Sequence, residues 1–209
     1  MSEIVQTMTL PDVIPYWFGN LRADRPFSYE SAEFRRWYGK DPKIDTELRT
    51  AFGALHQSIT AEGSALAGEA TGEEMLARII VIDQMSRNMF RDTARMYACD
   101  DLGLALSRSL VETEAYRGLD LFRQMFAALP FMHSERLADQ ERMIIEFDRF
   151  SRDAKDLPTA DFFADALRFA RRHLEIVARF GRFPHRNAIL GRTSTPEETA
   201  FLLEADSSF

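Results

Sequence analysis

The amino-acid sequence predicts an all-α protein, and its composition gives the first reasons. Glycine and proline, the residues that most disfavour helices, number 10 and 8 among 209 residues, which is below their average share. Valine occurs five times, whereas alanine, leucine, arginine, glutamate and methionine are abundant. No segment alternates between apolar and polar residues as a half-buried strand does. We therefore expect helices along most of the chain.

Capping signals place three of the expected helix starts. Asp41 precedes Pro42, which is typical of an N-cap followed by proline at the first helical position. Thr71 and Thr195 are each followed three residues later by glutamate, the spacing of a capping box. Together with the apolar periodicity, these signals predict helices over residues 10–18, 42–61, 72–91, 99–116, 119–129, 134–153, 159–180 and 196–204.

The least helical part of the chain is residues 20–41. It contains Pro26, Phe27, Trp37 and Tyr38, and we expect it to form an aromatic-anchored arm packed on the helical body. The length of 209 residues otherwise fits a single helical domain over residues 1–209.

The expected helix over residues 72–91 changes character along its length. Its first half is apolar nearly all round, as in a buried central helix. At 100° per residue, its second half gathers polar side chains within an arc of about 140°. These side chains belong to Asp83, Gln84, Arg87, Asn88 and Arg91. The arc either meets solvent or lines a polar chamber, and Asp83 can pair with Arg87 at i+4.

The helix over residues 159–180 carries two adjacent apolar stripes, which indicates that it packs between neighbours on both sides. His173 lies within one stripe, so we interpret it as a hydrogen-bonded core histidine. Gly181 fits the left-handed position that ends such a helix.

The segment LPFMHSERLADQER, residues 129–142, predicts the junction of two helices. We expect Pro130 to end the first helix and Ser134 to cap the second. His133 and Glu135 flank this cap, where free backbone N–H groups receive an anion or a histidine positions a proton donor. Capping alone also explains Ser134.

The strongest contrast in the sequence is one of charge. The chain has a net charge of −7, yet residues 179–195 contain four arginines, one histidine and no acid. The planar guanidinium suits carboxylate and phosphate groups. This segment therefore either receives an anionic ligand or pairs with acids from elsewhere in the fold, of which Asp83 and Glu135 are the main candidates.

Four segments of the chain resemble the bacterial family named domain of unknown function 924. They are IDQMSRNMFRDTARMYACD, LPFMHSERLADQE, ARRHLEIVARFGRFPHRNAILGRTSTPEETAFL and VIPYWFG. The family's first motif usually reads like LLDQFPRN, and Met85 and Ser86 replace its Phe-Pro pair here. The resemblance implies stacked antiparallel helix pairs in a right-handed superhelix similar to tetratricopeptide repeats. It implies no particular activity.

Three functional hypotheses follow. In the first, the protein is a binding module for an anionic small molecule or a peptide carboxylate or phosphate, bound in a concave site. Its ligand-binding residues are Gln84, Arg87, Asn88, Arg91, Arg182, Arg186 and Asn187, with His185 beside them.

In the second hypothesis, the protein is an enzyme in which His133 or His185 transfers protons with Glu135 or Asp83 as the carboxylate partner. The sequence contains none of the common hydrolase, metalloprotease, phosphate-loop or dinucleotide motifs beside these residues.

In the third hypothesis, the polar residues form a purely structural network. Asp83 and Glu135 then neutralise Arg87, Arg182 or Arg186.

Composition also indicates which binding partners and which cellular compartment to expect. The sequence pI of about 5.2 argues against duplex nucleic acid and anionic membranes as partners. A single cysteine and four histidines without an i, i+4 pair give no metal-ligand spacing, so we expect no metal and no cofactor. The lone Cys99 excludes an internal disulfide, and no signal peptide is recognisable. We expect a cytoplasmic protein.

Overall fold

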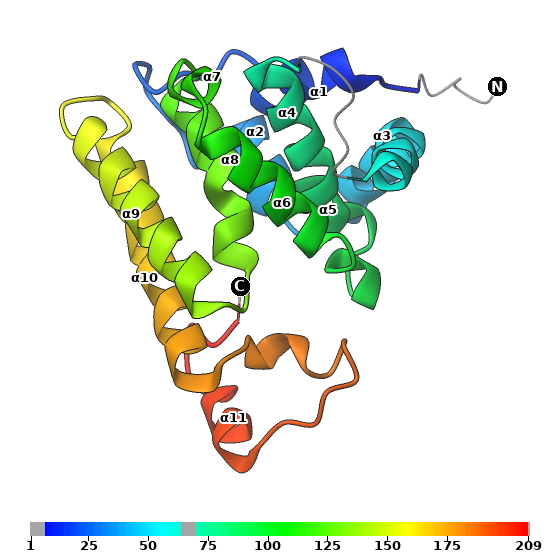
Figure 1. Ribbon diagram of the computed structural model, residues 1–209, viewed down its shortest axis with the longest axis vertical. Coiled ribbons are helices and arrows are strands. Elements are labelled where there is room, and N and C mark those ends of the chain that lie inside the picture. The colour runs from blue at the N-terminus through cyan, green and yellow to red at the C-terminus, as the bar shows by residue number, and fades with distance from the viewer. Residues whose placement is uncertain (1–6, 64–69, 209) are drawn as a thin grey trace.

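The computed structural model describes residues 7–63 and 70–208, and every regular element within them is helical (Figure 1). The all-α prediction is therefore confirmed. The elements are α1 (Leu10–Phe18), α2 (Ala32–Tyr38), α3 (Pro42–Glu62), α4 (Gly72–Ile79), the π-helical η1 (Ile80–Met85), α5 (Ser86–Met89), the 3-10 turn η2 (Ala94–Met96), α6 (Asp100–Val111), α7 (Glu114–Arg117), α8 (Leu121–His133), α9 (Leu137–Asp153), α10 (Ala160–Phe180), the 3-10 turn η3 (Pro184–Arg186) and α11 (Pro196–Phe201).

Helix α8 lies at the centre of the packing. It contacts α9 on one side and α6 on the other, and its Phe122 and Phe126 are fully buried. Beyond α9 lies α10, and the two run antiparallel for most of their length (Figure 1). Beyond α6, α4 packs between α6 and α1. Consecutive helices thus pair as neighbours, while the tetratricopeptide-like superhelix stays a prediction.

The predicted caps are present. The Asp41 side chain accepts the backbone N–H of Lys43, and Thr71 and Thr195 each form a capping box. Gly181 ends α10 with a φ of 67°, a left-handed conformation that glycine adopts without strain.

The arm over residues 20–41 packs on the body through aromatic rings. The ring of Phe27 lies 4.6 Å from that of Phe162 in α10, and Trp37 lies 4.6 Å from Phe126 in α8. The arm also contains α2, capped by Ser31, which the sequence analysis missed. Seven residues make only two turns, too few for a helical period to show.

The junction between α8 and α9 differs from the prediction. Pro130 lies inside α8, which continues to His133, so the expected helix end at Pro130 is wrong. Proline removes one helical hydrogen bond, but here the residue is buried in the core, and packing holds the helix together. The amide of Gln140 donates to the carbonyls of Phe131, Met132 and Ser134, and so satisfies the end of α8.

Ser134 also has a different role from the one expected. It follows the last residue of α8, and α9 begins only at Leu137. Its hydroxyl donates to Asp139 at 2.7 Å and accepts the backbone N–H of Arg136. His133 therefore occupies a helix C-terminus, where the helix dipole favours positive charge, rather than flanking an N-terminus.

The predicted single α-helix over residues 72–91 is interrupted by η1. A π-helical turn holds more residues than an α-turn, so it rotates the residues that follow relative to those before it. As a result, the predicted polar face divides in two. Asp83 and Arg87 face α6 and α8, whereas Asn88 and Arg91 contact Asp45 of α3.

Candidate functional site

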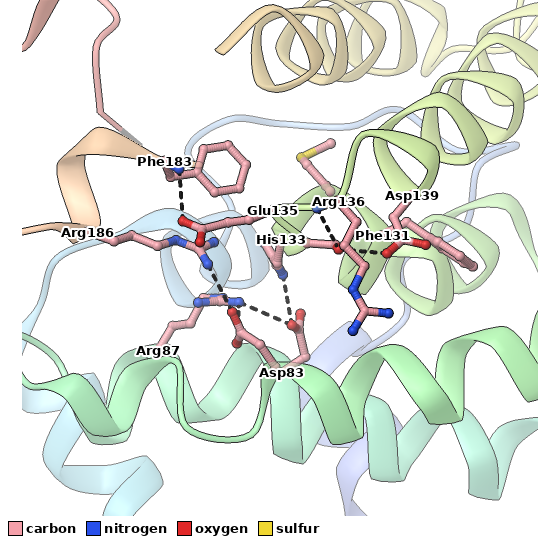
Figure 2. A network of polar contacts seen from close by, with 12 residues as sticks. Asp83, Arg87, Phe131, His133, Glu135, Arg136, Asp139, Phe183 and Arg186 are labelled. Carbon is pink, nitrogen blue, oxygen red and sulfur yellow. Dashed lines mark hydrogen bonds and ion pairs between the residues drawn. The ribbon is translucent and has the colours of Figure 1, made fainter. Parts of the chain in front are cut away.

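Asp83 is the most deeply buried acid of the candidate site. The π-helical η1 carries it, and no part of its side chain is exposed. Its Oδ1 accepts a hydrogen bond from Nδ1 of His133 at 2.8 Å and from Nη2 of Arg87 at 3.2 Å (Figure 2). Its Oδ2 accepts one from the side-chain amide of Gln84 at 2.6 Å. A buried carboxylate with this many donors is stabilised in its ionised form.

Asp100, at the start of α6, joins the two arginines that the sequence analysis singled out. Its Oδ1 accepts Nη2 of Arg87 at 2.9 Å, and its Oδ2 accepts Nη1 of Arg186 at 3.2 Å. Arg87 and Arg186 are 99 positions apart in the chain, yet they share one carboxylate. We call the series His133, Asp83, Arg87, Asp100 and Arg186 the Asp83 network.

Sequence reasoning missed Asp100. An acid in the first turn of a helix is common because the helix dipole favours it there, so nothing in the sequence marked this residue as part of a site. Its only signal is that it is the last residue of the segment IDQMSRNMFRDTARMYACD, which also contains Asp83 and Arg87.

Arg186 anchors the C-terminal end of the network. It lies in η3 with 6% of its surface exposed, and its guanidinium carbon is 4.5 Å from the ring centres of both Tyr97 and Phe183. Its Nε has no hydrogen-bond partner among the residues that the structure describes. Burial and the nearby charge of Arg87 lower the pKa of Arg186. The guanidinium is thus buried with part of its donor capacity unused.

The network borders a cavity of about 270 Å³ between α6, the end of α8 and η3. Its polar lining residues include Tyr97, Asp100, His133, Glu135, Arg136 and Arg186. In Figure 2, the side chain of His133 descends towards Asp83, and the guanidinium of Arg186 lies next to that of Arg87. The cavity therefore brings a histidine, three acids including Asp101, and a buried arginine to one place.

The contacts of His133 define its tautomer. Burial opposes the ionisation of Asp83, but its interactions with His133 and Arg87 outweigh this and hold its pKa well below its usual range. Because an ionised carboxylate only accepts hydrogen bonds, Nδ1 of His133 must carry a proton. Burial and the charge of Arg87 lower the pKa of His133 despite the attraction of Asp83. At neutral pH, the ring is therefore neutral, with the lone pair on Nε2.

Glu135 fastens residues 181–195 to the start of α9. It accepts two hydrogen bonds from Arg192, at 2.6 and 2.9 Å, and one from the backbone N–H of Phe183 at 2.8 Å. Burial opposes its ionisation, but the Arg192 contact lowers its pKa. The structural hypothesis has Asp83 and Glu135 neutralise Arg87, Arg182 or Arg186. The Asp83–Arg87 pair is present, whereas Glu135 forms its ion pair with Arg192, and Arg186 acts on it only through its charge.

Two further predicted ligands lie away from the cavity. Arg91 binds both oxygens of Asp45, at 2.7 and 2.9 Å, and Asn88 donates to the same carboxylate at 3.2 Å. Asp45 is buried in α3. These side chains fasten α5 to α3 and do not line the cavity.

Another pair of predicted ligands forms a contact at the C-terminal end. Arg182 binds both oxygens of Glu198 at 2.6 and 2.7 Å, and Asn187 donates to Glu198 and to Ser194. This contact closes the loop between α10 and α11. His185 lies beside Phe183, and burial together with Arg186 lowers its pKa to about 4.

Two other properties of the described residues bear on function. Across residues 7–63 and 70–208, no group of three or more histidines, cysteines or acids is placed to hold a metal ion. Over the same residues, no helix has both the length and the apolar character needed to span a membrane. A cytoplasmic location stays a prediction.

Fold and site together define an all-helical protein with a polar cavity that is lined by a buried arginine and by a histidine whose ring contacts a buried aspartate. The family model described as "Bacterial protein of unknown function (DUF924)" matches residues 13–206, and the chain belongs to this family. A solved structure, the protein of unknown function ATU0120 from Agrobacterium tumefaciens, is similar at 30% identity with a TM-score of 0.69. The similarity covers 94% of this chain and 97% of that one. No curated protein matches.

Proposed function

We propose that the cavity binds a small anionic ligand through its carboxylate or phosphate group, with Arg186 as the anchor. The observation that carries this proposal is a buried guanidinium at the cavity wall, whose hydrogen bond to Asp100 engages Nη1 alone. A guanidinium offers five N–H donors in a fixed plane. Burial strengthens its hydrogen bonds to an anion because water competes less.

The size of the cavity supports a small ligand. At about 270 Å³ it lies near the lower end of the range of small-molecule sites. A compact metabolite fits such a volume, and so does the terminal group of a larger ligand. The ring of Tyr97, against the Arg186 guanidinium, adds an apolar wall.

A thermal-shift and calorimetric screen of carboxylates and phosphates tests this proposal. At 100 times its Kd, a ligand stabilises the native state by about 2.7 kcal/mol, which raises Tm by roughly 5–10 °C in a protein of this size. We expect Arg186→Gln to abolish the response. The matched control Arg182→Gln lies on the same loop but outside the cavity, and it should retain the response. Absence of any response in the unmodified protein, or an equal response in Arg186→Gln, would overturn the proposal.

A second candidate function is acid–base catalysis on the bound ligand. The observation that favours it is the 2.8 Å contact between His133 and Asp83, which directs the basic Nε2 away from the carboxylate. The neighbouring hydroxyl of Ser134 is engaged with Asp139, so the proton removed would come from the ligand or from water.

Conversion of ligands from the screen, followed by NMR, tests this candidate. We expect His133→Gln to bind the ligand without converting it, whereas His185→Gln should still convert it. Equal turnover in His133→Gln and the unmodified protein would exclude His133 as the base.

A further inference from the structure

The charges around the cavity specify the ligand more closely than its size does. Resting on the anion site proposed above, and as an alternative to the catalytic candidate in which Nε2 stays unprotonated, we infer that the ligand is a monocarboxylate and that it binds together with one proton, which His133 accepts at Nε2. It is supported by the charge balance of the lining and by the direction of the His133 lone pair.

The charged groups in and directly behind the cavity wall balance one another. Four acids face four arginines, and His133 is neutral. They are Asp83, Asp100, Asp101, Glu135, Arg87, Arg136, Arg186 and Arg192. A phosphate-ester dianion entering this site would bring two uncompensated charges into a partly buried space, which is costly. A monocarboxylate that binds together with one proton adds no net charge to the site.

The tautomer of His133 requires that proton. Because Nδ1 donates to Asp83, the nitrogen left for the cavity is Nε2, which carries a lone pair in the neutral ring. A carboxylate held by Arg186 in the same cavity would meet this lone pair with its own lone pairs, and the two repel. Protonation of Nε2 converts the contact into a charge-assisted hydrogen bond. Binding and proton uptake are then linked.

The groups that face His133 set how readily it accepts the proton. Asp83 from η1 and Asp100 from α6 favour the imidazolium, while Arg87 from α5 opposes it; His173 from α10 is uncharged at neutral pH. Across the cavity, Glu135 attracts the proton, and Arg136 and Arg186 repel it, next to the uncharged Tyr97. The C-terminus of α8 adds a favourable dipole. Burial keeps the His133 ring neutral in the free protein, so the negative charge of the ligand is what favours its protonation.

Calorimetry on the full chain tests this inference, with acetate and inorganic phosphate as probes in two buffers of different ionisation enthalpy. We expect about one proton to be taken up per acetate at neutral pH, with acetate affinity falling about tenfold per pH unit above pH 7. Phosphate, mostly dianionic above that pH, should bind at least tenfold more weakly than acetate.

A pair of variants locates the proton. In His133→Asn, the side-chain amide supplies a donor to Asp83 but does not titrate, so acetate should bind without proton uptake and with little pH dependence. The control His56→Asn replaces a histidine that contacts Ser86 rather than the cavity, and it should keep the uptake.

The outcomes separate this inference from the proposal on which it rests. If neither probe binds at any pH, the anion site itself is refuted. If acetate binds without proton uptake, or if phosphate binds more tightly than acetate, the anion site stands and the present inference is overturned. Should His133→Asn fail to fold, the buffer and pH dependence of the unmodified protein decides the question alone.

Discussion

Asp100→Asn is the substitution that most directly perturbs the Asp83 network. The carboxylate accepts Arg87 on one oxygen and Arg186 on the other. Asparagine keeps the shape of the side chain, but it offers one acceptor oxygen and presents an NH2 group to the other guanidinium. That guanidinium then faces a donor instead of an acceptor, within a site where Arg186 is only 6% exposed.

The expected loss of stability in Asp100→Asn depends on which partners the two arginines keep. Arg87 keeps Asp83 as a partner, so its charge stays compensated. Arg186 loses its carboxylate while remaining buried, and removing one member of a buried pair costs about 3–5 kcal/mol. Because the asparagine oxygen still accepts one hydrogen bond, we expect a loss near the lower bound, about 3 kcal/mol, or roughly 6–12 °C in Tm.

Urea and thermal unfolding measure this loss, with Asp101→Asn as the matched control. Asp101 is the next residue, also lines the cavity and is exposed. We expect the control to change stability by less than about 0.5 kcal/mol. Added acetate should recover part of the stability lost in Asp100→Asn, because it replaces the missing carboxylate. A loss no larger than that of the control would refute the assignment of Asp100 as the shared partner.

Three further outcomes are expected. Glu135→Ala removes the contacts to Arg192 and to the Phe183 backbone, so amide exchange over residues 181–195 should accelerate; unchanged exchange there would contradict the fastening role of Glu135. Burial lowers the pKa of His173 to about 3 and of His185 to about 4, below the 6.5 of the unfolded chain. The unfolded state therefore takes up these protons first, and the free energy of unfolding should fall by about 1.4 kcal/mol per pH unit for each histidine from pH 6 towards 4.5; a flat profile in urea titrations would be inconsistent with their burial. Trp37→Ala should lower stability by about 3–5 kcal/mol because it empties the space against Phe126, and a loss below 1 kcal/mol would show that the arm contributes little to the core.

Much of the fold was predictable because its signals are local. Capping boxes at Thr71 and Thr195 depend on residues three apart, and the wide apolar surface of α10 follows from its own periodicity. The π-helical turn at η1 and the passage of α8 through Pro130 were not predictable. Both depend on tertiary packing, which overrides the local preferences of the backbone.

The candidate site was predictable only in part, for a related reason. The sequence indicated that an acid-free, arginine-rich segment needs anionic partners, and it singled out Asp83, His133 and Arg186. Which arginine meets which acid is decided in three dimensions. Arg91 forms an ion pair with Asp45, which holds two helices together, and Arg182 forms one with Glu198, which closes a loop. Asp100, which joins the two central arginines, looked like an ordinary first-turn acid.

The most direct test of the account is the protonation state of His133, measured by 15N NMR of histidine-labelled protein, with His133→Asn used to assign its signals. In the free protein at pH 7, we expect a neutral ring with the proton on Nδ1. Saturating acetate should convert it to the imidazolium while the hydrogen bond to Asp83 persists. A proton on Nε2 in the free protein, or a ring that acetate leaves unchanged, would contradict the geometry on which the proposed site depends.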